Sequence, residues 1–460
     1  MNARDLQDAL DAARVKNNVP GASVAFLAGG EVTSAASGVT NVTTGVEVSH
    51  DTIMHVGSIT KVMNATLVMQ LVDEGKVALE RPVIDYVPDF RVGDAEATRS
   101  ITVEQLLNHT SGIDANLLPD SGHDNETLDN TVARFTAAPQ LHVPGRARSY
   151  CNAGTVLAGH LSRRLFGTNW YDLIKERIFA PLGLEHAAVL PEDALLHRAS
   201  VGHFADPASG KPVRTSHAFL PLGYAPAGAT NMMSASDLLT FARSHLSDGL
   251  APNGARLLSE ENAARMRRRS GPALGGPEAF DCGIGWVRGT NGFVQHGGGG
   301  PGIVSVVIMH AESKTAAVVL TNAEHGLGLI VEVLRPFLIA EVGVDPFASP
   351  PQPLADPKID LTPYPGLYEN NTVVFDVAIK DDALTLSALV KHKVYDSSLV
   401  EWSAPRILTE AGDGWFLSDE PGALPLRLLD PDARGRTRYL AQSLWLFGRR
   451  DGDQRAAHGG

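Results

Sequence analysis

The sequence predicts an α+β domain followed by a small antiparallel β-barrel. Three observations support this class: strand-type segments stand at both ends of the region before residue 345, helical segments lie between them, and short β-type runs dominate the remainder. Helices that flank an antiparallel sheet built from both ends of a region form an α+β architecture. We therefore expect a large domain over residues 1–345, a proline-rich linker over 346–356 and a barrel over 357–460.

The first eighty residues alternate helix and hairpin signals. The hydrophobic spacing predicts an N-terminal amphipathic helix, then two β-type runs around Gly29-Gly30 that form a hairpin, then a helix that begins after Ser58 and ends at Gly75. The N-terminal helix reaches about Asn17, and the hairpin strands cover 22–27 and 32–37.

The middle of the chain, from about residue 80 to 270, is mainly helical. Capping signals precede apolar helices at Thr102 and Ser234, and helical periods cover 152–165 and 170–179. From Gly283 the pattern changes to strands. These are expected at 284–287, 302–309 and 315–320, before a closing helix at 327–339.

The barrel is predicted from the residues after the linker. Five of the twelve residues from Pro346 to Pro357 are proline, which favours a stiff extended spacer. Beyond this spacer, turn residues separate short apolar runs, and roughly eight strands in about a hundred residues are typical of a small barrel. Four of these runs cover 373–379, 383–389, 424–429 and 439–447.

Charge and composition exclude several classes of partner. The formal net charge is −13, so phosphate backbones and anionic membranes are repelled, and we expect neither a nucleic-acid nor a membrane partner. The chain has no apolar run of about twenty residues. Its first residues form an acidic amphipathic pattern rather than a secretory signal, which predicts a cytoplasmic location.

The cysteine content predicts neither a disulfide framework nor a metal site. Cys151 and Cys282 are the two cysteines, and no CxxC or His/Cys spacing accompanies them. We therefore expect no metal and no cofactor.

The segment Gly57-Ser58-Ile59-Thr60-Lys61 stands where a turn enters a helix. This spacing places Lys61 about one helical turn beyond Ser58 on the same face, where a neutral amine could take the hydroxyl proton. Neutrality near pH 7 requires lowering a pKa of about 10.4 by some three units, roughly 4 kcal/mol of burial and neighbouring charge. The alternative is a helix cap with a surface lysine.

Two further segments carry candidate chemistry. In Tyr150-Cys151-Asn152 the tyrosine oxygen can relay protons with the lysine, and the asparagine amide can hold a substrate carbonyl. The segment His296-Gly297-Gly298 is expected to end a strand that begins with Phe293-Val294, and its glycines let backbone N–H groups approach a ligand as part of an oxyanion hole. A phosphate loop is the competing interpretation, but no lysine or helix start comes after the glycines as that motif requires.

The order Ser-x-x-Lys, Tyr-x-Asn and His-x-Gly resembles the superfamily of penicillin-binding proteins, class C β-lactamases and related esterases. Supporting stretches lie at 106–112, 226–228, 236–238 and 283–286, and the resemblance covers about residues 5 to 340. It implies a β-lactamase/transpeptidase-like domain, in which an antiparallel sheet flanked by helices carries a helical subdomain.

The resemblance also implies roles for individual residues. Ser58 is the expected nucleophile, and Lys61 and Tyr150 are expected to share general-base and general-acid work. The expected substrate-binding groups are Asn152, His296, Gly298 and Gly299, with the backbone N–H of Gly299 completing an oxyanion hole with that of Ser58. The sequence departs from the β-lactamase pattern at His296, where a mostly neutral imidazole replaces a lysine, and this weakens an antibiotic-resistance interpretation.

Within the superfamily, His-x-Gly is similar to the motif of D-aminopeptidases. A single lipocalin-like barrel, opened by Tyr364-Pro365-Gly366-Leu367-Tyr368, and the absence of an export signal resemble instead the penicillin-binding-protein-type thioesterases. Those enzymes take a nonribosomal peptide from a carrier-protein thioester and close it head to tail. This resemblance favours a peptide cyclase whose partner is a peptidyl carrier-protein thioester.

Three alternatives stay open. The first is a D-specific aminopeptidase or amidase, and the second is a carboxylesterase or promiscuous hydrolase; both act on a small peptide or ester. The third is a catalytically silent binding protein, but such proteins have usually lost the serine, lysine or tyrosine that this chain retains.

Overall fold

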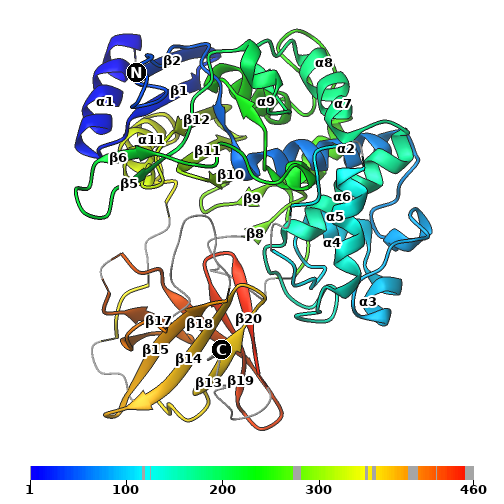
Figure 1. Cartoon of the computed structure of the whole chain (residues 1–460), viewed down its shortest axis with the longest axis vertical. Helices are drawn as coiled ribbons and strands as arrows, with labels where there is room; N and C mark the ends of the chain where they lie inside the picture. Colours follow the sequence, from blue (N-terminus) through cyan, green and yellow to red (C-terminus); the bar gives the residue numbers. More distant parts are fainter. Residues whose placement is uncertain are drawn as a thin grey trace.

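A seven-stranded antiparallel sheet forms the centre of the N-terminal part (Figure 1). Its strand order is β2-β1-β12-β11-β10-β9-β8, and β1 pairs with β12 through Ala22 and Thr321, so the two ends of this region meet in one sheet. The strands are β1 (Gly21–Ala28), β2 (Glu31–Gly38), β8 (Asp281–Cys282), β9 (Val287–Arg288), β10 (Phe293–Gly300), β11 (Ile303–His310) and β12 (Thr315–Thr321).

The computed structural model describes residues 2–116, 120–124, 126–272, 281–347, 351–354, 359–391, 402–420 and 422–450. Within these residues it confirms the predicted α+β and barrel architecture.

Helices cover both faces of the sheet because the side chains of its strands alternate between them. Val24 and Phe26 of β1 pack with α1 (Ala3–Lys16) and α11 (Leu327–Val342), and the Phe26 ring stacks on Phe337 at 4.1 Å. Ala25 and Leu27 face the opposite layer, which contains α2 (Thr60–Asp73) and α9 (Ala235–Leu246). This second layer brings the start of α2 against the sheet.

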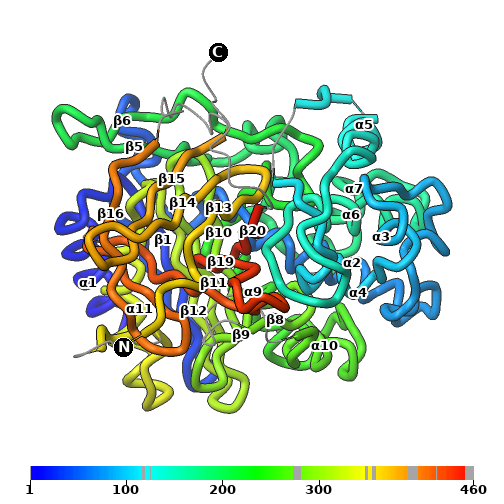
Figure 2. Tube along the Cα trace, turned by 90° about the horizontal axis from the view of Figure 1, so that it is seen from below, coloured from blue at the N-terminus to red at the C-terminus, as the bar shows by residue number. Residues whose placement is uncertain are grey.

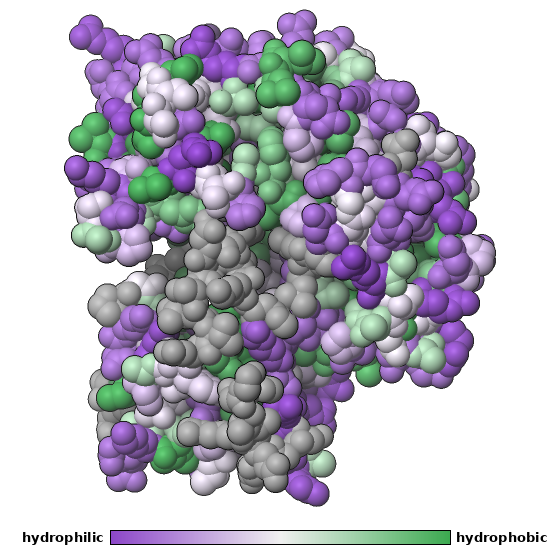
Figure 3. Space-filling model, in the orientation of Figure 1, coloured by the Kyte–Doolittle hydropathy of each residue, from purple (hydrophilic) through white to green (hydrophobic). Residues whose placement is uncertain are grey.

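In the helical region between the two groups of strands, two helices begin at the capping residues that the sequence predicts. Thr102 forms a capping box with Gln105, and the side chain of Ser234 caps α9. Hydrophilic residues cover most of the face of this region around α3 to α6 (Figure 3), so its apolar side chains face inward. The other helices are α3 (Ala95–Ser100), α4 (Val103–Leu107), α5 (Thr127–Arg134), α6 (Asn152–Phe166), α7 (Trp170–Ile174), α8 (Ala180–Leu182) and α10 (Glu260–Arg267).

Short strands outside the main sheet complete this part. β3 (Met54–His55), β7 (Met232–Met233) and β4 (Ala187–Ala188) form a three-stranded sheet, and β5 (His203–Ala205) pairs with β6 (Pro212–Arg214).

One strand prediction in the main sheet is wrong, and another ends too early. The run 284–287 is not one strand, because Gly283–Trp286 forms the turn between β8 and β9, and Gly285 adopts a φ of +73° there. A Cβ at Gly285 would lie 2.7 Å from the Cβ of Ala65, so this turn packs directly on α2. The strand that was expected to end with His296-Gly297-Gly298 runs two residues further, because β10 continues to Gly300, which pairs with Ile303.

The C-terminal part is a closed barrel of eight antiparallel strands, as predicted. Its strands are β13 (Gly366–Glu369), β14 (Val373–Lys380), β15 (Ala383–Val390), β16 (Arg406–Gly412), β17 (Trp415–Ser418), β18 (Leu426–Pro431), β19 (Thr437–Gln442) and β20 (Trp445–Arg449). The predicted single run 439–447 is wrong, because a tight turn at Ser443-Leu444 splits it into β19 and β20. Ser443 has a φ of +54°, the left-handed conformation that two-residue hairpin turns require.

The β19–β20 hairpin lies on the side of the barrel that faces the rest of the chain (Figures 1 and 2). Tyr439, Ala441 and Leu446 of this hairpin pack around Ala147, with Leu141 beside them. Ala147 is three residues before Tyr150, so the barrel contacts the segment that carries a candidate catalytic residue.

Candidate active site

Ser58 lies in a 3₁₀ turn, Gly57–Ile59, between β3 and α2. Gly57 has a φ of +53°, and a Cβ on it would lie 2.8 Å from the backbone nitrogen of Gly299. A Cβ on Gly298 would lie 2.0 Å from the carbonyl oxygen of Val56. Both positions therefore need glycine, and the close approach sets the backbone of β10 directly beside Ser58.

Lys61 is buried in the first turn of α2 with its amine beside the serine. Its Nζ donates to Ser58 Oγ at 3.0 Å and to the carbonyl oxygen of Ala227 at 2.5 Å. Burial lowers the pKa of Lys61 to about 7. A large fraction of the amine is therefore neutral near pH 7, and its lone pair can then accept the proton of Ser58 while an N–H still donates to Ala227.

Tyr150 completes a cluster with these two residues. It belongs to an irregular segment that leads into α6, and its phenol hydrogen-bonds Ser58. Nζ of Lys61 lies 4.8 Å from the centre of the tyrosine ring. Burial raises the pKa of Tyr150 well above its usual value, so the phenol stays protonated at neutral pH and can give and regain a proton.

Asn152 is the first residue of α6, two positions after Tyr150. Its backbone N–H donates to Asn116 Oδ1 at 2.9 Å, and the Asn116 side chain donates in turn to the carbonyl oxygen of Tyr150. Asn116 therefore ties both ends of the Tyr-x-Asn segment together.

His296 is buried in β10 as a neutral imidazole. Its Nδ1 lies 2.7 Å from the carbonyl oxygen of Gly297, which can only accept, so Nδ1 carries the proton. Its pKa falls to about 4 because of burial and the nearby charge of Lys61. Nε2 has no hydrogen-bond partner among the described residues and offers a lone pair. The site thus holds an acceptor where the β-lactamase pattern has a cation.

Asn116 was not among the sequence candidates, and neither were two aromatic residues beside Tyr150. The His109 ring lies 4.5 Å from the Tyr150 ring, and its Nδ1 accepts the N–H of Cys151 at 3.2 Å. Trp445, the first residue of β20, meets the Tyr150 ring edge-on at 5.8 Å. His109 stands within the family-like stretch 106–112, which was a usable signal, but no local signal connects Trp445 to Tyr150.

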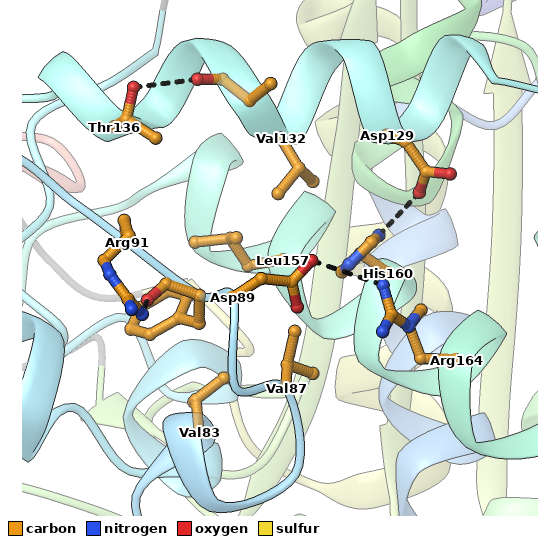
Figure 4. A pocket seen from close by; sticks show the side chains of 12 residues that line it. Val83, Val87, Asp89, Arg91, Asp129, Val132, Thr136, Leu157, His160 and Arg164 are labelled. Atoms are coloured by element: carbon orange, nitrogen blue, oxygen red, sulfur yellow. Dashed lines mark hydrogen bonds and ion pairs between the residues drawn. The ribbon is translucent and has the colours of Figure 1, made fainter.

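A cavity of about 330 Å³ lies elsewhere, between α5, α6 and the loop before α3 (Figure 4). It is lined by Leu157, by the contact between Asp129 and the His160 ring, and by the ion pair between Asp89 and Arg164. It shares no residue with the cluster of Ser58, Lys61 and Tyr150. In the described part of the chain, no group of three or more His, Cys, Asp or Glu residues could hold a metal ion.

The family model described as "Beta-lactamase" matches residues 6–332, and the chain belongs to this family. Among curated proteins it is 36% identical to "Penicillin-binding protein 4" of Amycolatopsis lactamdurans, over 79% of this chain and 96% of that protein. The predicted resemblance is therefore confirmed at the level of the family, the serine hydrolases of penicillin-binding-protein and class C β-lactamase type.

Solved structures extend the similarity over both parts of the chain. The crystal structure of SurE has a TM-score of 0.79 and 26% identity, covering 97% of this chain and 99% of SurE. A D-stereospecific amidohydrolase from a Streptomyces species has a TM-score of 0.57 and 26% identity, covering 72% of this chain and 98% of that chain. Across the described residues, no helix has the length and apolar character needed to cross a membrane.

Proposed function

We propose that Ser58 takes an acyl group from a peptidyl carrier-protein thioester and that the N-terminal amine of the same peptide then releases it as a ring. The observation that carries this proposal is the buried cluster in which Lys61 Nζ lies 3.0 Å from Ser58 Oγ and has a pKa of about 7. Such a lysine is a general base matched to neutral pH.

In the acylation step, Lys61 accepts the proton of Ser58 as Oγ attacks the thioester carbonyl. The carbonyl oxygen develops negative charge, which the backbone N–H groups of Ser58 and Gly299 would stabilise. The carbon–sulfur bond then breaks, and the thiol leaves with a proton delivered through Tyr150. The Asn152 amide would orient the peptide during this step.

In the release step, the peptide amine attacks the ester carbon and the bond to Ser58 Oγ breaks. The proton that the amine loses passes through Lys61 and Tyr150 to Oγ, so the site returns to its starting protonation state. His296 Nε2 carries a lone pair without a partner among the described residues, so it can accept a hydrogen bond from the attacking amine and orient it.

The electrostatics of the site favour a neutral amine. Burial, followed by the charge of Lys61, lowers the pKa of both His109 and His296. The same environment would lower the pKa of an incoming N-terminal ammonium and keep it in its nucleophilic form. An enzyme that must bind a substrate ammonium gains nothing from such surroundings.

Cyclisation needs the amine to defeat water. A well-oriented intramolecular nucleophile can reach an effective molarity of about 10⁵ M or more, against water near 55 M. The barrel supports cyclisation, because its β19–β20 hairpin contacts the Tyr150 segment and so borders one side of the site, where it can limit the access of water.

The second candidate is a D-stereospecific amidase or aminopeptidase, favoured by the similarity to the D-stereospecific amidohydrolase. Both candidates take a D-residue at the acyl position, and they differ in what resolves the acyl-enzyme. We propose the cytoplasm as the location, because a carrier-bound peptide would be the substrate.

The products separate the two candidates. A linear peptidyl pantetheine thioester that ends in a D-residue should give mainly a lactam, which is lighter than the linear acid by one water molecule in mass spectrometry. The matched thioester that ends in the L-residue serves as the control. Mainly linear acid from a varied set of D-ended thioesters, together with rapid release of N-terminal D-residues from short peptides, would assign the chain to the D-aminopeptidases.

A further inference from the structure

We infer that the β19–β20 hairpin of the barrel positions Tyr150 for proton transfer, so the barrel acts on the chemical step itself as well as on substrate selection. This inference rests on the part of the proposed function that makes Ser58 the nucleophile, and it is independent of whether the product is a ring.

The segment that carries Tyr150 belongs to no helix or strand, so no regular pattern of backbone hydrogen bonds holds it. Residues 147–150 are irregular and run straight into the helix that begins at Asn152. A side chain on such a segment is held only by the hydrogen bonds and packing that neighbouring elements supply. The position of the phenol therefore depends on which elements contact residues 149 to 151.

His109 holds this segment from the side of the helical region. Its carbonyl oxygen accepts the N–H of Ser149 at 3.0 Å, and its Nδ1 accepts the N–H of Cys151 at 3.2 Å. The two bonds fall on either side of Tyr150. His109 adopts a φ of +62° to make them, a conformation that residues other than glycine seldom adopt.

The barrel holds the same segment from the other side. The N–H of Tyr150 donates to the carbonyl oxygen of Leu444 at 2.9 Å, and the N–H of Leu446 donates to Ser149 Oγ at 3.1 Å. Leu444 belongs to the tight turn between β19 and β20, so the hairpin tip itself makes the contact.

Trp445 stands between these two hydrogen bonds and reaches the tyrosine ring. The two rings meet edge-on at 78°, with 5.8 Å between their centres. The His109 ring is tilted by 35° to the Tyr150 ring, and Lys61 Nζ lies 4.8 Å from its centre. The Tyr150 ring is thus confined by one aromatic group from the helical region, one from the barrel and one amine from α2.

Apolar contacts and one ion pair hold the hairpin against the segment that leads to Tyr150. Tyr439, Ala441 and Leu446 surround Ala147, and Arg146 forms an ion pair with Asp430 at 2.6 Å. The ion pair is partly exposed and adds little, so the apolar contacts carry most of the docking. The barrel therefore contacts Ser149 and Tyr150 directly, and Tyr150 carries the phenol that hydrogen-bonds Ser58.

The consequence is testable with a reagent too small to need the barrel for binding. A small alkyl fluorophosphonate reports only how readily Ser58 attacks, and a misplacement of about 1 Å in a catalytic group can cost about a hundredfold in rate. Trp445→Leu and Ser149→Ala should each slow labelling of the full-length protein by about tenfold or more, whereas Trp445→Phe should restore most of the rate.

Trp415→Leu is the matched control, because Trp415 lies in β17 and stacks on Arg427 of the barrel itself. It should label at the wild-type rate. Circular dichroism of each variant reports whether the barrel remains folded, so that a rate loss can be attributed to the contact.

A double-mutant cycle decides whether the effect passes through Tyr150. In a Tyr150→Phe background, Trp445→Leu should cause no further loss, because the proton-transfer group that it positions is already absent. Equal losses in both backgrounds would overturn the inference. Unchanged labelling in Trp445→Leu and Ser149→Ala, with altered preference among peptidyl thioesters, would also overturn it and would leave the barrel as a substrate wall. Neither result bears on whether lactam or acid is formed.

Discussion

Replacing Lys61 with methionine should stabilise the fold while abolishing the chemistry. Burial moves the pKa of Lys61 from 10.5 to about 7. One pKa unit corresponds to about 1.36 kcal/mol, so at pH 7 the buried lysine lowers the free energy of unfolding by about 4 kcal/mol relative to a neutral side chain. Methionine has a similar length and removes that cost, but it leaves the Ala227 carbonyl oxygen without its donor, at about 1–3 kcal/mol. The net expectation is a gain of about 1–3 kcal/mol.

The pH dependence of the free energy of unfolding distinguishes the removal of a buried charge from a simple improvement in packing. Between pH 7 and 10.5 the unfolded state binds more protons at Lys61 than the folded state, so wild-type stability rises with pH across that window. The Lys61→Met variant lacks this contribution, and its advantage at pH 7 should shrink toward pH 10. Thermal unfolding at pH 7 and at about pH 9.5 measures both effects, with an expected rise in Tm of about 2–5 °C at the lower pH.

Labelling kinetics complete the assay. Wild-type acylation by a fluorophosphonate should rise with pH through about 7, as Lys61 loses its proton, and the methionine variant should label at least about a hundredfold more slowly. Lys76→Met is the control, because its side chain is half exposed and should change stability by less than about 0.5 kcal/mol. A Lys61→Met protein that is less stable than wild type by the same amount at both pH values would refute the reasoning.

Two further variants test the remaining side chains of the cluster. Tyr150→Phe should slow acylation at least about a hundredfold in a folded protein, and a near-wild-type labelling rate would remove the phenol from the mechanism. His296→Lys should speed acylation by benzylpenicillin, which we expect to be slow in the wild type, because an ammonium can pair with the antibiotic's carboxylate. His296→Gln is its neutral control, and equal penicillin rates in the two variants would show that the missing cation does not limit this reaction.

The local parts of the site could be predicted from the sequence because local spacing determines them. Ser58 and Lys61 are three residues apart at the start of one helix, so helical geometry alone brings their side chains together. The N-terminal hairpin and the capping box at Thr102 were predicted in the same way from adjacent residues.

The strand errors have tertiary causes. The strand was expected to end with His296-Gly297-Gly298, and Gly299 and Gly300 come directly after this motif although glycine is depleted in strands. In the structure Gly299 and Gly300 continue β10 by pairing with Val304 and Ile303. Gly298 must be glycine because a Cβ there would collide with Val56 before the turn that carries Ser58. A requirement for close approach thus overrides the intrinsic preference of the residue.

The contact between Trp445 and Tyr150 could not be predicted from local pattern. The run from Tyr439 to Phe447 resembles one strand, because the turn residues Ser443 and Leu444 lack the Asn-Gly or Asp-Gly signal of a hairpin. The position of this turn beside Tyr150 depends on the packing of the barrel against Ala147. Tyr150 and Trp445 are nearly three hundred residues apart in the chain, so no local pattern connects them.

The most direct test of the account is the mass of the acyl-enzyme. The full-length protein, mixed briefly with a D-ended peptidyl pantetheine thioester and quenched in acid, should gain the mass of the acyl group, and peptide mapping should place it on Ser58. Ser58→Ala should gain no mass and form no product. An adduct on another residue, or undiminished product from Ser58→Ala, would contradict the claim that Ser58 carries the acyl group.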